Sequence, residues 1–583
     1  MSLVSIIELR VALHLGQVSP KTHEQPNKTV AIIGGGLSGL TTAYNVVKHL
    51  SQTSRQRTKI VIYDKHDRLG GWCHSVNVPA NVVTGSDHSR GTVVFETGPR
   101  SIRPSGGVGW LTIDMAHDIG LTSQILTVSK SAPSARNRFL LTSDNGLTLM
   151  PSSLTSALVS PLTTPLIRRI LPGVLSEPLQ ARSSLHDLVD KEQADESVDA
   201  FFRRRFGSKL ADDVVSAMIH GIWSGDSRRL SVRTLFPGLW DAECRRGSVI
   251  KAALLSSKKN QRGKLSVYQQ QLQEDKSLVD ELQDKIAQTG AEGKTLVHDM
   301  KLASVWGLKG GLEQLIQGLR SWLVKHDVEI KTGRAAELTH SDGNWTITSD
   351  GESDLQPTHV IATVPQALPV ELRPTPIPNS TVAVVNLAFS QPTNTSSNRL
   401  FPPGFGYLIP RSIPIEMNPH RALGVIFDSD VMPNVDDSQQ NNLIKCSVLM
   451  GGSYWLDSGP PTSMTHHDDL VRAALETIRL HVPQVKSMNS NLFKLLFSLS
   501  HVHHECIPQV PPMYHEHVRS LEQRLQNVRQ LRNGVKVAIV GSGLASVGVN
   551  GAVKHAWNVG MSVARDIQGQ GQMKFGTEEW TRT

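Results

Sequence analysis

Near the start of the chain, residues 34–39 read Gly-Gly-Gly-Leu-Ser-Gly and fit the spacing G-x-G-x-x-G between an apolar run and a helix-like segment. In this pattern Gly34 permits a tight turn, Gly36 lets the backbone approach a pyrophosphate and Gly39 allows close packing of helix on strand. Asp64 ends the next apolar run, where a carboxylate can accept hydrogen bonds from ribose hydroxyls. These residues predict a dinucleotide site, and the alternative is a glycine turn without a ligand.

A second glycine-rich stretch follows at residues 67–72, Asp-Arg-Leu-Gly-Gly-Trp. It resembles the second glycine motif of the large flavoprotein oxidase superfamily that includes the amine oxidases. The resemblance implies that Arg68 and the glycines line a pyrophosphate, and it favours FAD over NAD. It also places Val328 where the superfamily has a valine against the adenine, although a plain core valine would look the same.

A third glycine stretch lies close to the C-terminus, where a strand-like run at 537–540 leads into Gly541 and Gly543 and then a helix that ends near Ile567. This segment has two readings, a second nucleotide-binding fold or the closing strand and helix of the first domain. We favour the second, because too few residues remain for another strand–helix unit. The positive helix N-terminus would then face the flavin ring and stabilise its anionic reduced form.

The remaining pattern indicates a mixed sheet and two helical regions. Between Met150 and Ser184 the chain is rich in leucine, proline and arginine and predicts short broken helices. Residues 251–300 keep heptad spacing except at Asp275, which favours a solvated, mobile helical insert over a coiled-coil partner site. Strands are predicted at 28–34, 59–64, 328–330, 359–364, 381–389, 422–427, 445–450 and 535–540, with a helix at 40–50.

Composition limits the classes of protein. The 583 residues exceed one domain, and 39% hydrophobic with 19% charged residues is typical of globular proteins. The net charge is +8, but Lys and Arg are spread along the chain, which disfavours a nucleic-acid partner. Four distant cysteines suggest neither zinc nor disulfides. No stretch has the length of a spanning helix, and residues 1–27 read either as a presequence or as a disordered extension.

Five further motifs make the resemblance more specific. Residues 95–104, 137–139, 221–233, 404–410 and 449–452 are similar, in this order, to the oxygen-dependent protoporphyrinogen oxidase family. The match spans most of the chain outside 1–27 and 251–300. It implies an α/β, mixed α+β, fold class with a Rossmann-like FAD-binding domain, a mixed-sheet substrate domain and an α-helical membrane-binding domain.

The implied domains are discontinuous. The predicted boundaries are 28–127, 321–370 and 500–568 for the FAD-binding domain, 128–149, 262–320 and 371–499 for the substrate-binding domain with its helical insert, 150–261 for the membrane-binding domain, and 569–583 for a C-terminal tail.

The resemblance also implies an activity and a location. The reaction is the six-electron oxidation of protoporphyrinogen IX to protoporphyrin IX in heme biosynthesis, with one non-covalent FAD per chain and O2 as acceptor, giving H2O2. In eukaryotes the family is bound to the inner mitochondrial membrane, on the intermembrane-space side. A homodimer and hand-off to ferrochelatase are left open. The membrane contact is predicted, against the alternative of an ordinary core edge, at Leu154, Leu158, Leu162, Leu166, Ile167, Ile170 and Leu171, with Arg168 and Arg169 toward anionic lipid.

Site residues follow from the resemblance, position by position. Arg138 lies at the position of the family arginine that binds a substrate propionate. A guanidinium can bind a carboxylate with two parallel hydrogen bonds. Phe405, Leu408 and Leu449 would sandwich the macrocycle, while Gly221 leaves room beside it. The residues implied to bind FAD are Gly34, Gly35, Gly36, Leu37, Ser38, Gly39, Asp64, Arg68, Gly71, Trp72, Gly98, Pro99, Arg100, Ser101, Val328, Ser542, Val547, Gly548 and Val549.

No catalytic side chain is assigned, because flavin N5 accepts the hydride and the protein supplies orientation and electrostatics. A metal site at His501, His503 and Glu505 is not expected, since the segment continues into residues 506–509, which resemble a family segment without metal. The alternatives are a flavin amine oxidase, whose cationic substrate Arg138 would repel, and a catalytically silent flavoprotein scaffold. Residues 544–546 and the length of the 251–300 insert depart from the family pattern.

Overall fold

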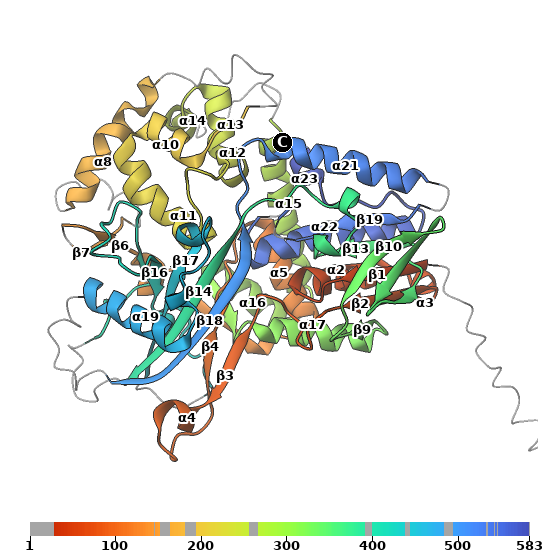
Figure 1. The fold of residues 1–583 in the computed structure, drawn as a ribbon, viewed down its shortest axis with the longest axis horizontal. Helices are drawn as coiled ribbons and strands as arrows, with labels where there is room; N and C mark the ends of the chain where they lie inside the picture. Colours follow the sequence, from red (N-terminus) through yellow and green to blue (C-terminus); the bar gives the residue numbers. More distant parts are fainter. Residues whose placement is uncertain are drawn as a thin grey trace, which may run out of the picture.

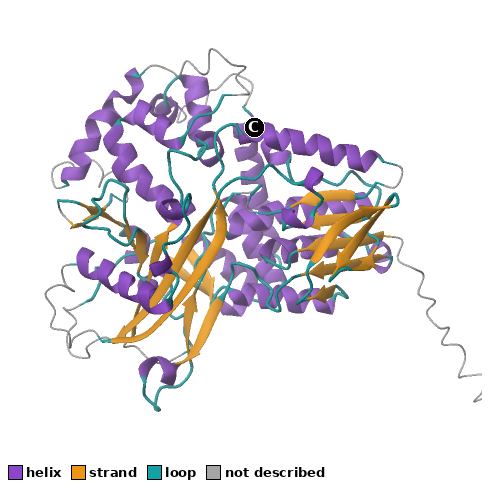
Figure 2. Cartoon of the chain, viewed as in Figure 1, coloured by secondary structure: helices purple, strands orange, loops and turns teal. Residues whose placement is uncertain are grey.

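The computed structural model describes residues 28–144, 146–151, 164–180, 194–255, 266–390, 399–437, 443–482, 494–531, 534–541, 543–544 and 546–581. The predicted presequence at 1–27 lies outside these ranges. A parallel sheet with its helices occupies one end of the molecule, two long strands run through the middle, and a cluster of helices lies beyond them (Figures 1 and 2).

The first sheet has five parallel strands in the order β19-β13-β1-β2-β9. Its strands are β1 (Lys28–Ile33), β2 (Thr58–Tyr63), β9 (Glu329–Lys331), β13 (His359–Ala362) and β19 (Lys536–Ile539). Since β19 pairs with β13 in register Val360 to Val537, the C-terminal segment closes the first domain, and the reading as a second nucleotide fold is wrong.

Alternation along β1 sends neighbouring side chains into two different cores. Val30 and Ile32 pack into one core and Ala31 and Ile33 into the other, as the two-residue period of a strand requires. The first core is covered by α2 (Leu37–His49), α5 (Gly106–Asp118), α17 (Glu313–Lys325) and α22 (Val549–Ile567). The second is covered by α21 (Tyr514–Gln530) and a small sheet of β10 (Ala336–Ser341), β11 (Asn344–Ser349) and β12 (Glu352–Leu355). Each fully buried Val or Ile contributes roughly 1.5–3 kcal/mol.

The predicted insert forms two helices, α15 (Val267–Ala287) and α16 (Ala291–Leu302). Leu282 and Ile286 are buried in the same core as α2 and α5, so the pair packs on the nucleotide-binding side and is not loosely attached. Asp275 accepts a hydrogen bond from the backbone N–H of Gly107 at 2.9 Å. The break in the heptad pattern therefore marks a contact with the start of α5, a contact that single-sequence periodicity does not reveal.

The second sheet has seven strands in the order β18-β14-β17-β16-β15-β6-β7. All neighbours are antiparallel except β15 and β6, so the sheet is mixed, as predicted. Helix α19 (His467–His481) packs on its apolar side. The strands are β6 (Phe139–Thr142), β7 (Gly146–Leu149), β14 (Asn379–Ser390), β15 (Gly406–Leu408), β16 (Ala422–Ile426), β17 (Leu443–Gly451) and β18 (Leu495–Pro508).

The helical region builds its own core from aromatic and aliphatic residues such as Phe201, Phe202 and Trp240. Its helices are α8 (Pro165–Ser176), α10 (Val198–Phe206), α11 (Ser216–Trp223), α12 (Val232–Leu235), α13 (Pro237–Arg246) and α14 (Val249–Leu255). Smaller elements are α3 (Gln52–Gln56), α4 (Ala80–Thr84), α6 (Pro133–Arg136), α18 (Asp428–Val431), α23 (Glu578–Thr581), β3 (Ser75–Pro79), β4 (Thr92–Glu96), β5 (Ile125–Ser129) and β8 (Ala303–Leu308). Across the described ranges, no helix is both long enough and apolar enough to cross a membrane.

The predicted membrane-contact residues are only partly available to a membrane. Leu166 and Ile167 are buried under the protein itself, Leu166 packing with Leu140 and Ala217, so for these two the prediction is wrong. Arg169 pairs with Asp144. Leu154, Leu158 and Leu162 lie outside the described residues.

Candidate functional site

The first glycine loop joins β1 to α2 and has no room for side chains at its ends. Gly34 has φ +108°, and a Cβ there would lie 2.0 Å from Oγ1 of Thr363. A Cβ at Gly39 would lie 2.0 Å from the carbonyl oxygen of Gly34. The turn and the close approach of helix to strand therefore both require glycine, as the sequence pattern predicts.

The second glycine loop lies beside the first. Gly70 pairs with Gly36 in an isolated parallel bridge, and its N–H donates to the carbonyl of Gly35 at 3.0 Å. Arg68 folds over its own loop and donates to the carbonyls of Leu69 at 2.9 Å and Gly71 at 2.6 Å. In this structure Arg68 thus holds the loop in shape.

Gly36 and Gly71 leave a space between the two loops that is bordered by backbone atoms only, and we call this space the cradle. A Cβ added at Gly36 would meet nothing closer than Gly71, 3.9 Å away, in contrast to the crowded Gly34 and Gly39. Helix α2 begins at this point with no side-chain cap and no acidic residue in its first turn. Free N–H groups and open space at a helix N-terminus suit a pyrophosphate, so the residues present fit a dinucleotide cofactor.

Asp64 and Val328 have defined surroundings. Asp64 accepts from the N–H of Gly35 through Oδ2 at 2.7 Å and from the N–H of His66 through Oδ1 at 2.9 Å. The carboxylate therefore ties the first loop to the end of β2, and its contact with a ribose stays a prediction. Val328 is buried in the core shared with α17, so its place against an adenine also stays a prediction.

The C-terminal glycine stretch positions the start of α22. Gly548 caps the helix with φ +106° and no side-chain cap. Asn550, in the first turn, accepts from Oγ1 of Thr112 at 2.8 Å and donates to the carbonyl of Arg103 at 2.9 Å, which ties α22 to the segment before α5. Val547 is half-buried and Val549 buried, while Ser542 lies outside the described residues.

The segment that follows β4 packs against the second glycine loop. A Cβ at Gly98 would lie 1.9 Å from the carbonyl oxygen of Trp72. Trp72 is 46% exposed, and its ring meets His503 edge-on with centroids 5.0 Å apart. His503 donates from Nε2 to the carbonyl of Thr97 at 2.6 Å, and burial lowers its pKa to about 4, so this histidine is neutral at pH 7.

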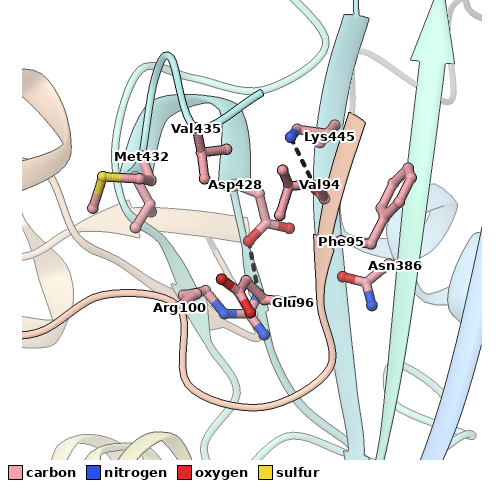
Figure 3. A pocket seen from close by; sticks show the side chains of 10 residues that line it. Val94, Phe95, Glu96, Arg100, Asn386, Asp428, Met432, Val435 and Lys445 are labelled. Carbon is pink, nitrogen blue, oxygen red and sulfur yellow. Dashed lines mark hydrogen bonds and ion pairs between the residues drawn. The ribbon is translucent and has the colours of Figure 1, made fainter. Parts of the chain in front are cut away.

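Arg100 forms an ion pair with Asp428 in this structure. Its guanidinium lies 2.7 Å from Oδ1 of Asp428 and lines a small cavity of mixed polar and apolar character between β4 and the second sheet (Figure 3). Glu96 faces the same cavity, and burial raises the pKa of its carboxyl to about 7. Arg100 therefore joins the segment after β4 to α18 beside the second sheet, and Pro99 and Ser101 are half-buried next to it.

Three of the predicted substrate residues come together on one face of the seven-stranded sheet. Leu408 on β15 and Leu449 on β17 both pair with Gly424 on β16, and residues directly opposite across strands share a face. Helix α11 covers this face, and a Cβ at Gly221 would lie 2.5 Å from Cδ2 of Leu408. The two leucines and Gly221 thus form one apolar surface.

Gly424 is the residue of this surface that the sequence did not identify. It separates Leu408 from Leu449, and a Cβ there would lie 2.7 Å from the carbonyl oxygen of Tyr407. A glycine inside a predicted strand is a signal for close approach of another group, so its position between Leu423 and Val425 was the available clue.

Arg138 and Phe405 meet where the neighbouring strands β6 and β15 of the same sheet begin. The N–H of Phe405 donates to the carbonyl of Asn137 at 2.9 Å, and the Arg138 guanidinium lies 5.9 Å from the centre of the Phe405 ring. Within the described residues the Arg138 side chain forms no ion pair or hydrogen bond. Arg138 is exposed to solvent, and partial desolvation of its guanidinium, followed by the charge of Arg103, lowers its pKa. An arginine without a carboxylate partner suits an anionic ligand.

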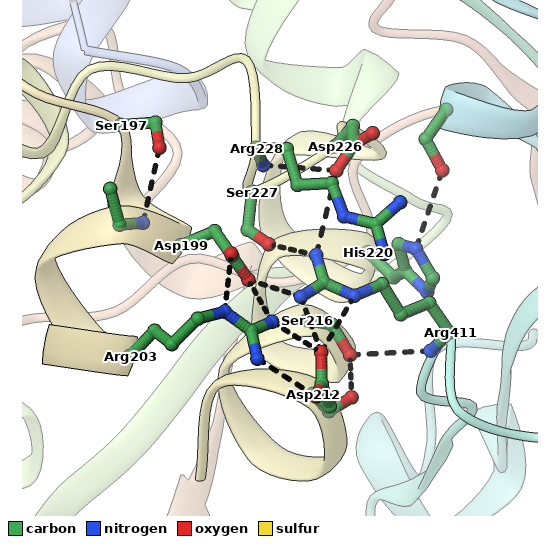
Figure 4. Close-up of polar contacts among 12 residues, drawn as sticks. Ser197, Asp199, Arg203, Asp212, Ser216, His220, Asp226, Ser227, Arg228 and Arg411 are labelled. Carbon is green, nitrogen blue, oxygen red and sulfur yellow. Dashed lines mark hydrogen bonds and ion pairs between the residues drawn. The ribbon is translucent and has the colours of Figure 1, made fainter. Parts of the chain in front are cut away.

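A charged network fixes α11 above this surface, and no sequence pattern indicated it. Arg411, just beyond β15, contacts Asp199 and lies 2.7 Å from both Oδ1 of Asp212 and Oγ of Ser227 (Figure 4). His220 in α11 lies with Nδ1 2.8 Å from the carbonyl of Ile409. These contacts join the helical region to the second sheet. The contacts of Arg411 and of His220 therefore together fix the distance between Gly221 on α11 and Leu408 on β15.

The histidines of β18 do not form a metal cluster with their neighbours. His501 and His503 have ring centroids 4.3 Å apart, whereas Glu505 lies in a bulge with φ +46°. In the part of the chain that the structure describes, no group of three His, Cys, Asp or Glu residues is arranged to hold a metal ion.

Comparison with known proteins adds relatives to this geometry. The sequence pattern of the family described as flavin containing amine oxidoreductase matches residues 37–401. Protoporphyrinogen oxidase of Homo sapiens is 28% identical over 548 residues, covering 92% of this chain and 98% of that protein. The protein of the same name from Schizosaccharomyces pombe is 29% identical over 550 residues, with coverage of 92% and 98%. A Nicotiana tabacum protein named protoporphyrinogen oxidase, mitochondrial, is 24% identical over 447 residues, covering 73% and 76%.

Solved structures share the fold. A protein from Exiguobacterium, whose name protoporphyrinogen oxidase is provisional, superposes with a TM-score of 0.63 at 16% identity, covering 93% of this chain and all of that one. Cyclohexylamine oxidase from Brevibacterium oxydans gives a TM-score of 0.53 at 13% identity, with coverage of 93% and 100%. Both confirm the predicted fold class.

Proposed function

The chain belongs to the flavin containing amine oxidoreductases, and from that premise we propose that it is an oxygen-dependent protoporphyrinogen oxidase of heme biosynthesis. Its cofactor is FAD, which when bound supplies two-electron oxidation of the substrate and transfer of those electrons to O2, giving H2O2. Full conversion of protoporphyrinogen IX removes six electrons. The curated relatives of this name, matched along almost their whole length, support the assignment.

The observation that carries the proposal is Arg138, which has no ion pair or hydrogen bond among the described residues and lies on the same sheet as an apolar surface. A tetrapyrrole needs a flat apolar site for its ring and a cation for its propionates, and Leu408 with Leu449 offers the first while Arg138 on Phe405 offers the second. The amine substrates of other family members are cations, which Arg138 would repel. Electrostatics therefore favour an acidic substrate over an amine.

The protein's own part in the reaction is to bind and orient. We propose that the open backbone between Gly36 and Gly71 holds the pyrophosphate, and that the positive N-terminus of α22 lies at the flavin ring, where it stabilises negative charge. Arg138 would fix the substrate by a carboxylate, so that the macrocycle lies on the leucines. The remaining predicted FAD contacts, including those of Trp72, Gly98 and Val549, belong to the same proposal.

We further propose that the chain works at the inner mitochondrial membrane. Support comes from the mitochondrial relative and from three exposed leucines on neighbouring elements of the helical region, Leu175 (68% exposed), Leu179 (87%) and Leu254 (70%). Helix α14, which carries Leu254, packs against the turn at Glu177–Leu179, and we call these three leucines the apolar patch. Replacing Leu175 and Leu179 by serine should reduce co-flotation with anionic vesicles, while Val370→Ser, at an equally exposed residue elsewhere, should not. Equal flotation of the wild type, the Leu175/Leu179 double variant and Val370→Ser would contradict membrane binding through the apolar patch. The intermembrane-space side, a homodimer and hand-off to ferrochelatase stay predictions.

The assay that tests the activity uses the protein purified in mild detergent. We expect a yellow protein that produces porphyrin fluorescence from protoporphyrinogen IX well above autoxidation, with matching O2 consumption. A yellow protein that leaves protoporphyrinogen IX unchanged would support FAD as the cofactor but contradict protoporphyrinogen IX as the substrate.

A further inference from the structure

The segment that follows α22 folds back onto the first domain, and we call its residues 573–580 the strap. The N–H of Ile539, on β19, donates to the carbonyl of Phe575 at 2.9 Å. A Cβ at Gly576, where φ is +87°, would lie 2.0 Å from the carbonyl oxygen of Ile539. Helix α23 then packs against α21 (Figure 1). The strap is therefore fitted closely against β19, the edge strand of the parallel sheet.

Side chains hold the strap in this shape. The carboxylate of Glu578 accepts from the N–H of Phe575 at 2.6 Å and from the N–H of Gly576 at 3.1 Å. Arg529, on α21, donates to the carbonyl of Met573 at 2.6 Å, and its guanidinium lies 3.8 Å from the centre of the Phe575 ring. Because these contacts fix the backbone of the strap, a side chain that the strap carries has a defined position.

Trp580 connects the strap to the third glycine stretch. Its indole N–H donates to the carbonyl of Leu544 at 2.7 Å. Both side chains lie in the same core, Trp580 with 8% and Leu544 with 3% of its surface exposed. Leu544 in turn donates its N–H to the carbonyl of Gly541 at 3.1 Å, and we call the segment between these two residues the glycine turn. A buried carbonyl needs a donor, and for Leu544 the strap provides it.

His555, on α22, makes a second connection. Its Nδ1 accepts from the N–H of Gly541 at 3.4 Å, and its Nε2 donates to the carbonyl of Gly576 at 2.9 Å. One tautomer, with its hydrogen on Nε2, satisfies both contacts, because a carbonyl only accepts and a backbone N–H only donates. The imidazole is buried. The strap therefore contacts both ends of the glycine turn, directly at Leu544 and through His555 at Gly541.

We propose that Trp580 is a positioning residue of the flavin site, and that through its indole N–H the strap holds the glycine turn in the conformation that binds FAD. This rests on the flavin part of the proposed function, which places the N-terminus of α22 at the flavin ring. Asn550 already fixes the start of α22 from the side of α5. A turn that is held in its bound shape loses less conformational entropy when the ligand binds, so FAD binds more tightly with Trp580 in place.

The coupling between strap and cofactor works in both directions. If the strap favours FAD binding, FAD binding stabilises the strap by the same factor. In the wild type, FAD should therefore slow hydrogen exchange at the N–H groups of Phe575 and Gly576, which donate to Glu578. The slowing should be greater than in the small sheet of β10, β11 and β12. A strap that only filled the core would respond to FAD no more than this sheet does.

The test compares Trp580→Phe with Trp345→Phe in the full-length apoprotein. Trp345, on β11, is 7% exposed and lies in the same core, where its ring stacks on His340, so the same substitution is made at a matched depth. In Trp580→Phe the dissociation constant of FAD, measured by fluorescence titration, should rise about fivefold, the order of one buried hydrogen bond. Exchange at the N–H of Leu544 should also become faster. Trp345→Phe should keep the wild-type FAD affinity and the wild-type exchange at Leu544.

Three results would overturn the proposal. Unchanged FAD affinity in Trp580→Phe would show that the strap does not support the flavin site, and an equal loss in both variants would show that Trp580 only fills the core. Weaker FAD binding with unchanged exchange at Leu544 would mean that the effect does not pass through the glycine turn. The substrate is tested separately, because a wild type that binds FAD but does not oxidise protoporphyrinogen IX would overturn the proposed activity and leave the role of Trp580 intact.

Discussion

The flavin half and the substrate half of this molecule are built in opposite ways. At the proposed pyrophosphate site the backbone of the glycine loops makes the site, and its residues are close in sequence: Gly34 to Gly39, then Gly70 and Gly71. On the second sheet side chains make the site, and they come from segments hundreds of residues apart, such as Arg138 and Phe405. A change in the first half should therefore alter cofactor affinity, and one in the second half substrate affinity.

The largest expected effect separates two glycines of the same loop. Gly36→Ala adds a methyl group to an open cradle at a negative φ, so the apoprotein should unfold at its normal temperature while FAD binding falls about 100-fold, ~2.7 kcal/mol. Gly39→Ala would clash with the carbonyl of Gly34 and should lower the unfolding temperature even without FAD. Fluorescence titration with FAD and thermal melts distinguish them. Wild-type FAD affinity in Gly36→Ala would show that the cradle is not the pyrophosphate site.

The next effect belongs to the substrate half alone. Arg138→Ala should raise the KM for protoporphyrinogen IX by roughly 10- to 100-fold, because a charge-assisted hydrogen bond of about 1.5–3 kcal/mol is lost. Flavin content should not change. Steady-state kinetics beside Arg136→Ala provides the control, and an unaltered KM in Arg138→Ala would remove this arginine from the site.

A third change tests the charged network that joins the helical region to the second sheet. Arg411→Met removes one of the two arginines that pair with both Asp199 and Asp212, and Arg203 is the other. Losing one partner of this partly buried ion network costs about 2 kcal/mol. The free energy of unfolding should fall accordingly, and KM should rise as α11 moves relative to β15. Arg229→Met breaks an exposed pair with Asp457 and should leave the free energy of unfolding almost unchanged, because water already screens this pair. Similar losses in both variants would contradict the role given to Arg411.

The smallest effect is expected at Gly221. A methyl group there meets the flexible end of Leu408, so Gly221→Ala should fold normally. The methyl group should tilt Leu408 toward the proposed substrate surface and raise the KM for protoporphyrinogen IX only a few-fold, about 0.5–1 kcal/mol. Gly571→Ala, where a Cβ has ordinary space, should have no effect. A normal KM in Gly221→Ala would mean that the macrocycle does not lie against Leu408.

The same contrast explains what could be predicted from the sequence. The β1 turn into α2 was predictable because the strand, the glycine spacing and the helix are consecutive, and local geometry fixes them. Leu408 and Leu449 read as plain core residues, because only pairing through Gly424 places them on one face. Their role, like that of Arg138, came from family resemblance.

Other features depend on contacts between distant segments and left no signal in spacing. The charge network of Arg411 joins residues about 200 positions apart, and no periodicity marks such a pair. Burial of Leu166 and Ile167 was missed because an amphipathic pattern does not state whether protein or lipid covers the apolar side. The break at Asp275 was visible, but its partner Gly107 was not.

The most direct measurement is anaerobic mixing of the flavin-loaded protein with protoporphyrinogen IX, followed through the visible absorbance of the flavin. The account predicts rapid bleaching by protoporphyrinogen IX, recovery on admission of O2, no bleaching by an amine such as putrescine, and slow bleaching in Arg138→Ala at low substrate concentration. Bleaching by the amine, or no bleaching by the porphyrinogen, would contradict the assignment of the second sheet as the site of an acidic tetrapyrrole.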